Sequence, residues 1–232
     1  IVGGGYIACE FAGIMNGLGV KTTQYFRADQ ILRGFDNEAR GIVADEMRKR
    51  GVDLQSGMNV SKIEKTTDGV RITNTNGDQM EVEAVMFATG RAPNTAGLIS
   101  EDVAVALGAK GEIMVDAYSQ SSVPSIYALG DVTDRVNLTP VAIREAMCFI
   151  DTVFRGQPTP VDHELIPTAV FTQPEMGTVG LTEEEAAAQE PIEVYSEKFR
   201  VMRHYFAGKD DASLVKLIVS AKTCKILGAH II

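Results

Sequence analysis

The sequence is poor in cysteine and has no long apolar run. Its three cysteines, Cys9, Cys148 and Cys224, are far apart and form no CxxC pair. They therefore indicate neither a disulfide framework nor a metal site, and we expect each to be a buried small side chain in a reducing cytoplasm. No apolar stretch reaches the roughly 18 residues that suggest a membrane span.

Basic residues are also in short supply. The chain carries 22 Lys and Arg against 31 Asp and Glu, and the net charge of −9 argues against a nucleic-acid partner. Repeats, low-complexity tracts and targeting segments are missing as well. At 232 residues and 45% hydrophobic content, the composition is that of a globular protein with two or three domains. Both ends lie in apolar, strand-like runs and no Met begins the chain, so we expect a fragment of a longer protein.

The chain opens with three glycines between an apolar pair and an apolar run at helical spacing. Gly3, Gly5 and Ala8 fit the spacing that joins a strand to a helix in dinucleotide-binding folds. Gly3 permits a sharp turn, Gly5 lets the backbone approach a pyrophosphate, and Ala8 lets the helix pack close to the strand. The free N–H groups and positive end of that helix favour phosphate. This segment predicts a nucleotide site.

The end of the second strand indicates which nucleotide. An NAD-binding unit carries an acidic residue about 20 residues after the glycines, and this residue binds the ribose 2′-hydroxyl. Phe26 stands there instead, and Arg27 and Arg33 follow. Two guanidinium groups suit a 2′-phosphate, so we favour NADPH over NADH; ordinary surface arginines are the alternative. Asp29 lies between them and either orients an arginine or weakens the site.

The remaining pattern predicts an α/β protein in three parts. Residues 1–92 read as a Rossmann-like domain with a parallel sheet and a β-meander, 93–163 as a central segment, and 164–232 as a strand-rich α+β part. The elements expected in the first part are a strand, helix and strand over 1–26, a helix from Asp36 to Arg50, a strand at 52–54, a meander at 60–65, 69–74 and 79–82, and a buried parallel strand at 84–88. Those expected later are strands at 113–116 and 125–131, a helix from Thr139 to about Phe154, strands at 169–171, 177–180, 192–199, 214–219 and 226–232, and a helix begun by Thr182.

Several segments in this order resemble the flavoprotein disulfide reductases, most closely their glutathione reductase branch. The matching segments are Gly3–Gly19 (GGGYIACEFAGIMNGLG), Arg27–Asp36 (RADQILRGFD), Ala88–Thr95 (ATGRAPNT), Ile126–Val132 (IYALGDV), Leu138–Ala142 (LTPVA) and Ile166–Leu181 (IPTAVFTQPEMGTVGL). The resemblance implies that residues 1–92 bind NADPH, that 93–163 complete an FAD domain, and that 164–232 are part of a dimerisation domain. It also implies a cytoplasmic homodimer that reduces glutathione disulfide through FAD and a redox disulfide.

The resemblance also implies roles for individual residues. Tyr6 matches a ring that covers the flavin until nicotinamide displaces it, or else a tyrosine packed at a helix start, and Glu10 matches an acid near the nicotinamide. Asp131 matches the carboxylate that binds the ribityl chain of FAD, and Thr139 matches a helix start at the flavin. The full expected set for cofactor binding is Gly3, Gly5, Ile7, Ala8, Arg27, Arg33, Thr89, Gly90, Arg91, Asp131, Leu138, Thr139 and Ala169.

Departures from the family pattern limit what this chain does alone. The FAD glycine fingerprint, the redox cysteine pair and the acid–base histidine of the partner subunit are not in it, and His163, His204 and His230 do not replace the last of these. We therefore expect the chain by itself to be a nucleotide-binding and dimerising piece without turnover. Trypanothione reductases share much of the pattern but carry an insertion near residues 16–19 that is absent here, which favours the glutathione branch. Lipoamide dehydrogenases carry an acid after the second strand, and Arg27 and Arg33 speak against that branch. These two kinds of reductase are the alternatives to a glutathione reductase.

Overall fold

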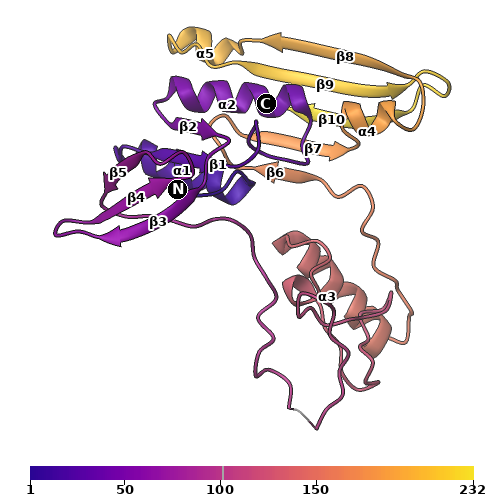
Figure 1. The fold of residues 1–232 in the computed structure, drawn as a ribbon. Coiled ribbons are helices and arrows are strands. Elements are labelled where there is room, and N and C mark those ends of the chain that lie inside the picture. Colours follow the sequence, from indigo (N-terminus) through magenta and orange to yellow (C-terminus); the bar gives the residue numbers. More distant parts are fainter. Residues whose placement is uncertain (101) are drawn as a thin grey trace. The chain divides into compact units, whose positions relative to one another are not determined.

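The computed structural model describes residues 1–100 and 102–232, which form two compact units (Figure 1). One unit combines residues 1–90 with 165–232, and the other comprises 91–164. None of the helices within those described residues is long and apolar enough to cross a membrane.

A small parallel arrangement of strands begins the first unit. β1 (Thr23–Phe26) pairs in parallel with β2 (Asp53–Ser56). Val2 adds parallel bridges to Tyr25 on one side and to Phe87 on the other. The order across this layer is therefore Phe87, Val2, β1 and β2, and all of its pairings are parallel, as predicted for the sheet of residues 1–92.

Helix α1 (Tyr6–Gly17) packs on these strands through small residues. Ala8, Cys9 and Ala12 are fully buried, which allows the close approach of helix and strand that the glycine motif predicts. The longer apolar side chains lie elsewhere on the surface, since Ile14 of α1 is 49% exposed and its C-cap residue Leu18 is 76% exposed.

Helix α2 (Asn37–Lys49) begins where the sequence predicts. The Asp36 carboxylate caps it by accepting hydrogen bonds from the backbone N–H groups of Glu38 and Ala39. Val43 and Met47 are buried, which confirms the predicted inner face. The predicted meander is also present, as the antiparallel strands β3 (Val60–Lys65), β4 (Val70–Asn74) and β5 (Gln79–Val82).

The prediction of a buried parallel strand at residues 84–88 is wrong. The segment makes only a single bridge, from Phe87 to Val2, and Phe87 is 55% exposed. The backbone still runs beside Val2, because Val2 N–H donates to Met86 O and Ala88 N–H donates to Val2 O, each at 2.8 Å. Pairing at a single position forms no ladder and therefore no strand, and an apolar composition alone does not bury the segment.

Residues 165–232 form a five-stranded antiparallel sheet in the order β6-β7-β10-β9-β8, as expected for this part of the chain. Its strands are β6 (Thr168–Val170), β7 (Met176–Gly180), β8 (Ile192–Phe199), β9 (Ser213–Ser220) and β10 (Ile226–Ile231). Thr182 begins α4 (Glu183–Ala187) with a capping box to Glu185. The short helix α5 (Met202–Phe206) was not anticipated.

Cys224 corrects the expectation that every cysteine is buried. It is exposed in the turn between β9 and β10, whereas Cys9 and Cys148 are buried as expected. It adopts a left-handed φ of 58°, so the tight turn holds this side chain outside the sheet.

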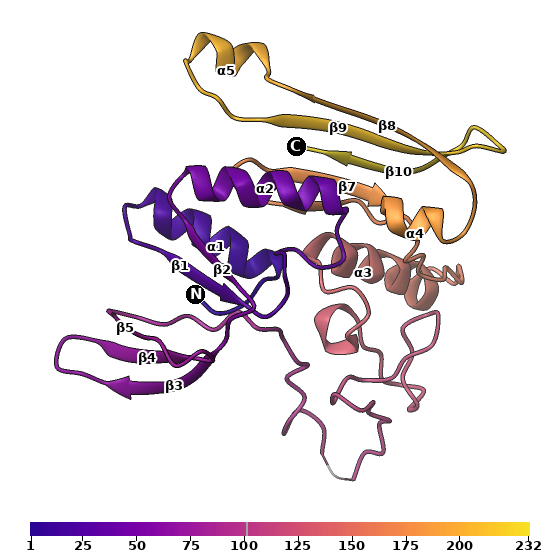
Figure 2. The ribbon, with the colours of Figure 1, turned by 45° about the horizontal axis from the view of Figure 1, so that its top comes forward.

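One hydrophobic core joins the two ends of the chain. α1, β1 and α2 contribute residues such as Ala12, Phe26 and Val43, and the five-stranded sheet contributes Val170, Met176 and Leu214. α2 lies between β1–β2 and the five-stranded sheet in both views (Figures 1 and 2). The predicted nucleotide-binding segment and the strand-rich segment are therefore packed together.

The second unit contains the predicted helix α3 (Thr139–Phe154), preceded by a short 3-10 helix, η1 (Gly130–Thr133). The strands predicted at 113–116 and 125–131 are absent from the described residues. Isolated antiparallel bridges take their place, from Leu107 to Ile113, from Val115 to Ser121 and from Gln120 to Tyr127. Each segment meets a partner at one position only, so the ladders that define strands do not form.

Candidate nucleotide-binding site

The turn before α1 requires glycine at one position and leaves space at another. Gly3 has a φ of 137°, and a Cβ there would lie 2.3 Å from the carbonyl oxygen of Ala88. A Cβ on Gly5 would meet no atom within 4 Å. Gly3 thus lets the first strand and Ala88 come close to each other. Gly5 leaves the start of α1 open.

The start of α1 suits an anion. Gly5 is the N-cap, no side chain caps the helix, and its first turn contains no acid. The positive end of the helix therefore has no neutralising carboxylate of its own. Together with the open face at Gly5, these features fit a dinucleotide pyrophosphate.

A loop with two arginines lies beside this turn. Arg27 and Arg33 are exposed, and within the described residues neither forms an ion pair. Leu32, which is fully buried with a φ of 56°, donates its backbone N–H to the carbonyl oxygen of Gly4 at 2.6 Å. This bond ties the arginine loop to the glycine turn. Asp29 is exposed, and the structure gives it no bond to either arginine.

Gln24 is a supporting residue that the sequence analysis missed. It is fully buried, and its Nε2 donates to the carbonyl oxygen of Gly3 at 2.9 Å and contacts Cys9 Sγ at 3.4 Å. Burial raises the pKa of the Cys9 thiol to about 11, so this cysteine is not a reactive thiol. The available sequence signal is a polar residue, Gln24, directly before two aromatic residues in a predicted strand.

Glu10 connects α1 to the five-stranded sheet. Its Oε1 accepts a hydrogen bond from the backbone N–H of Phe171 at 2.8 Å, just beyond β6. This contact places two predicted site residues, Glu10 and the exposed Ala169, in the same region. Tyr6 is half-buried at the start of α1 and packs against the core, and Ile7 beside it is also half-buried.

Thr89 and Gly90 follow the segment that runs beside Val2. Both are exposed, and Gly90 has a φ of 138° with open space where a side chain would begin. They therefore form an accessible end to this unit, where the sequence predicts a ligand-facing loop.

A second cluster of predicted residues lies within the other unit. The Arg91 guanidinium forms an ion pair with Asp131 at 2.8 Å and donates to the carbonyl oxygen of Asn137 at 3.0 Å. Asn137 precedes Leu138, the N-cap of α3, which has no side-chain cap and no acid in its first turn. The exposed Thr139 begins the helix. An uncapped positive helix end beside an exposed carboxylate fits a polar cofactor that carries both acceptors and hydroxyl groups.

A buried carboxylate supports this second cluster. Glu145 is 1% exposed, and its Oε2 accepts the backbone N–H of Gly130 at 2.5 Å. Its Oε1 pairs with Arg135 at 3.0 Å and His163 at 2.7 Å. The network fixes the turn that carries Asp131. The sequence signal is an acid at the helical spacing of the buried residues Val141 and Cys148.

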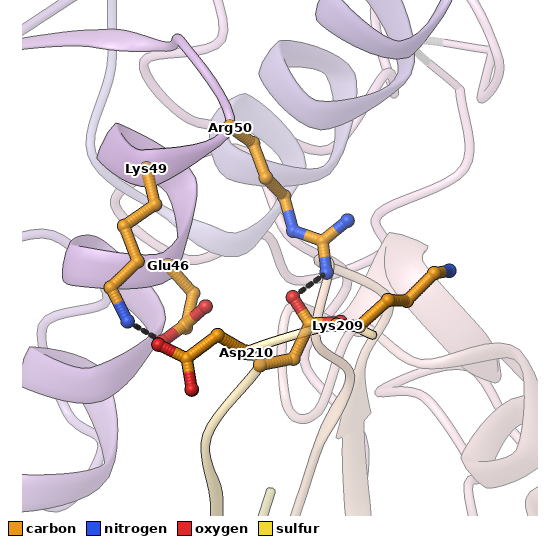
Figure 3. A pocket seen from close by; sticks show the side chains of 6 residues that line it. Glu46, Lys49, Arg50, Lys209 and Asp210 are labelled. Atoms are coloured by element: carbon orange, nitrogen blue, oxygen red, sulfur yellow. Dashed lines mark hydrogen bonds and ion pairs between the residues drawn. The ribbon is translucent and has the colours of Figure 1, made fainter. Parts of the chain in front are cut away.

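Two hollows in the described surface lie apart from the glycine turn. The first, of about 310 Å³, lies between the end of α2 and the chain leading to β9, and charges of both signs line it (Figure 3). Within it, Arg50 pairs with Asp211 and Lys49 with Glu46. The second, of about 340 Å³, lies between the arginine loop and α2. No group of three or more metal-ligating side chains is found among the described residues.

Comparison with protein families gives two matches along the chain. Residues 1–146 match the family described as pyridine nucleotide-disulphide oxidoreductase, and residues 166–232 match its dimerisation domain. Among curated proteins, a glutathione reductase of Burkholderia cepacia is 51% identical across the whole chain, and a glutathione reductase of Pisum sativum is 48% identical over 99% of it. A trypanothione reductase of Trypanosoma congolense is 42% identical across the whole chain.

The fold has close counterparts among solved structures. An HOCl-induced flavoprotein disulfide reductase from Escherichia coli, RclA, superposes with a TM-score of 0.90 at 29% identity over 99% of this chain and 53% of its own. The chain spans about half the length of the curated relatives it matches, with 52% of the Burkholderia protein and 42% of the Pisum protein covered.

Proposed function

Since the chain belongs to the pyridine nucleotide-disulphide oxidoreductase family, we propose that the whole protein is an NADPH-dependent reductase of glutathione disulfide. The two glutathione reductases at 51% and 48% identity support this substrate. Members of this family use FAD and a nicotinamide nucleotide as cofactors, and we infer the same for this protein.

The observation that carries the preference for NADPH is the arginine loop. Phe26 ends β1 where an NADH-binding unit would place a carboxylate, and the exposed Arg27 and Arg33 follow it. Two guanidinium groups without carboxylate partners among the described residues are free to take a 2′-phosphate, which their planar forks match. The Leu32 bond to Gly4 keeps this loop next to the pyrophosphate position.

The other site residues divide between the two cofactors. Gly3, Gly5 and the start of α1 hold the pyrophosphate of NADPH, and Glu10 with Ala169 lies at the nicotinamide end, next to Tyr6. Asp131 and the start of α3 hold FAD, the Asp131 carboxylate as an acceptor and Thr139 at the positive helix end. FAD, when bound, carries electrons from the nicotinamide to a redox disulfide.

The same family membership suggests the assembly and setting of the protein. A dimerisation domain is present over residues 166–232, and we infer a homodimer formed through it. The proposed division is an NADPH-binding domain at 1–92, an FAD-contacting segment at 93–163 and a dimerisation part at 164–232. The free thiols of Cys9, Cys148 and Cys224 are consistent with a cytoplasmic location.

The test uses the full-length protein with Arg27→Ala and Arg33→Ala. Each variant is expected to lose about 1.5–3 kcal/mol of NADPH binding, the size of a charge-assisted contact, while the NADH constants stay unchanged. Arg71→Ala, which removes an exposed arginine of β4 away from the arginine loop, is the matched control. An unchanged nucleotide preference in both variants would contradict the NADPH assignment.

The substrate is tested in the same assays by offering three disulfides. We expect glutathione disulfide to give the highest kcat/KM, ahead of trypanothione disulfide and lipoamide. A clear preference for trypanothione disulfide would contradict the proposed substrate and would indicate a trypanothione reductase, like the relative from Trypanosoma congolense.

A further inference from the structure

A buried lysine lies at the contact between α2, α4 and the five-stranded sheet. Lys216 of β9 is 1% exposed, and its Nζ lies 3.0 Å from Asp36 Oδ1. The same nitrogen lies 3.2 Å from Glu38 Oε2 and 2.6 Å from Glu183 Oε2. One cation therefore faces three carboxylates, two from the start of α2 and one from the start of α4.

The sheet itself does not explain a lysine here. Lys216 lies on the same face of β9 as Leu214 and Ile218, which are fully buried apolar residues. Burying an ammonium group is costly unless it is paired, and an apolar residue at such a position often stabilises a protein equally well. The lysine is therefore best explained by the carboxylates with which it pairs.

Asp36 is the partner with the most contacts. Its Oδ1 caps α2 through the N–H groups of Glu38 and Ala39, and its Oδ2 accepts the N–H of Glu183 at 3.2 Å. The carboxylate is fully buried. Without Lys216 it would be a buried negative charge balanced only by backbone N–H groups. Lys216 thus allows Asp36 to join α2 to the five-stranded sheet.

Asp36 also ends the arginine loop. Arg33 lies between two fixed points, Leu32, which bonds to Gly4, and Asp36, which bonds to Lys216. Phe35 N–H closes the intervening turn onto Leu32 O at 3.2 Å. Releasing Asp36 would free one end of this short segment, and with it the backbone that carries the Arg33 guanidinium.

We infer that Lys216 is a positioning residue for nucleotide selectivity, which acts through Asp36 to hold Arg33 at the 2′-phosphate of NADPH. The inference rests on the proposed function. It assigns part of the selectivity to the dimerisation segment, which supplies a buried cation rather than a contact with the nucleotide.

The test measures kcat/KM for NADPH and for NADH in the full-length holoenzyme. Lys216→Met keeps the length of the side chain and removes its charge. It is expected to lower the NADPH-to-NADH ratio by about tenfold through a higher KM for NADPH, since a displaced Arg33 loses a charge-assisted contact. The KM for NADH should stay within about twofold. Lys222→Met, in the exposed turn after β9, is the matched control and should leave the ratio unchanged.

The double variant separates positioning from general support of the fold. In an Arg33→Ala background, Lys216→Met should lower the ratio no further, because the residue through which it acts is gone. An equal loss for both nucleotides, or a full additional loss in the double variant, would overturn the inference. If neither Arg27→Ala nor Arg33→Ala lowers the ratio, the proposed NADPH function fails. If Arg27→Ala lowers it and Arg33→Ala does not, or if Arg33→Ala lowers it and Lys216→Met does not, only the role of Lys216 fails.

Asp36→Ser provides the second route should Lys216→Met not fold. Serine caps a helix about as well as aspartate, so α2 keeps its start while the bond to Lys216 is lost. The same fall in the NADPH-to-NADH ratio is expected. A folded Asp36→Ser enzyme with the wild-type ratio would overturn the inference.

Discussion

The Glu10 carboxylate accepts the backbone N–H of Phe171 at 2.8 Å, although the two residues are far apart in the sequence. The bond fixes the second turn of α1 to the chain just after β6. Because Ala169 lies next to this contact, residues from both ends of the chain meet at one proposed nicotinamide site. Neither segment forms that site by itself.

Removing the Glu10–Phe171 hydrogen bond should weaken the contact between α1 and the five-stranded sheet. Glu10→Ala removes the acceptor of the exposed Phe171 N–H, which water can then solvate, and is expected to cost about 0.5–1.5 kcal/mol of unfolding free energy. Glu10→Gln keeps an oxygen acceptor and should cost less. Urea unfolding of the two variants measures the difference, and equal losses in both would show that the charge of Glu10 matters rather than this bond.

The two glycines of the turn should respond differently to the same substitution. Gly3→Ala places a Cβ 2.3 Å from Ala88 O at a φ of 137°, so the variant is expected to unfold at markedly lower temperature. Gly5→Ala meets nothing within 4 Å and should keep the wild-type melting temperature. Its methyl group would stand in the path of the pyrophosphate, so NADPH affinity should still fall. Unchanged NADPH affinity in Gly5→Ala would place the phosphates elsewhere.

The buried pair of Asp36 and Lys216 should make stability depend on pH at acid values. Burial by itself would raise the pKa of the Asp36 carboxyl, but hydrogen bonds from Lys216, Ala39 and Glu183 lower it below its ordinary 3.8. Its contribution is therefore complete above pH 3.8 and lost as the pH falls through the lower folded-state pKa.

Lys216 should make stability depend on pH at alkaline values. Burial alone would lower the pKa of its ammonium group, but hydrogen bonds to Glu183 and Asp36 raise it above the ordinary 10.5, so its contribution is complete below pH 10.5 and lost as the pH rises through the higher folded-state pKa. Asp36→Ala removes the cap of α2 and one of the three carboxylates that face Lys216, and it should cost about 1–3 kcal/mol near neutral pH. Urea midpoints across the pH range should show the gap between wild type and variant closing at acid pH, and a constant gap would contradict the assignment.

The three cysteines should differ in reactivity. Cys224 is exposed, whereas Cys9 is buried with its pKa raised to about 11 and Cys148 is buried. Brief treatment of the native protein with iodoacetamide at neutral pH should label Cys224 and leave the other two unmodified, as read by peptide mass spectrometry. Unfolding in urea before labelling serves as the control and should expose all three. Rapid native labelling of Cys9 would mean that the glycine turn opens readily.

Local chemistry made much of the fold predictable. The Gly3 and Gly5 spacing, the Asp36 cap and the Thr182 capping box each act over a few residues, and the structure places α1, α2 and α4 where these signals indicate. The strands of the meander and of the five-stranded sheet also lie close to their predicted positions. The absence of a carboxylate after Phe26 and the presence of Arg27 and Arg33 are properties of the sequence alone.

Predictions based on composition alone failed where neighbours decide the outcome. Residues 84–88 are apolar but run beside a single partner, so Phe87 remains half-exposed. Cys224 was expected inside and lies in an exposed turn. An apolar side chain is buried only where another element covers it, and the sequence does not state which element that is.

The sequence by itself determined the class of fold, the glycine turn and the two arginines that follow β1, because each depends on residues close together in the chain. Only the tertiary structure decided that Lys216 meets Asp36, that Glu10 meets Phe171 and that Gln24 supports Gly3. Buried polar groups must find partners wherever the fold brings them, and those partners come from distant segments. The positions of these partners therefore follow from packing, which no local pattern encodes.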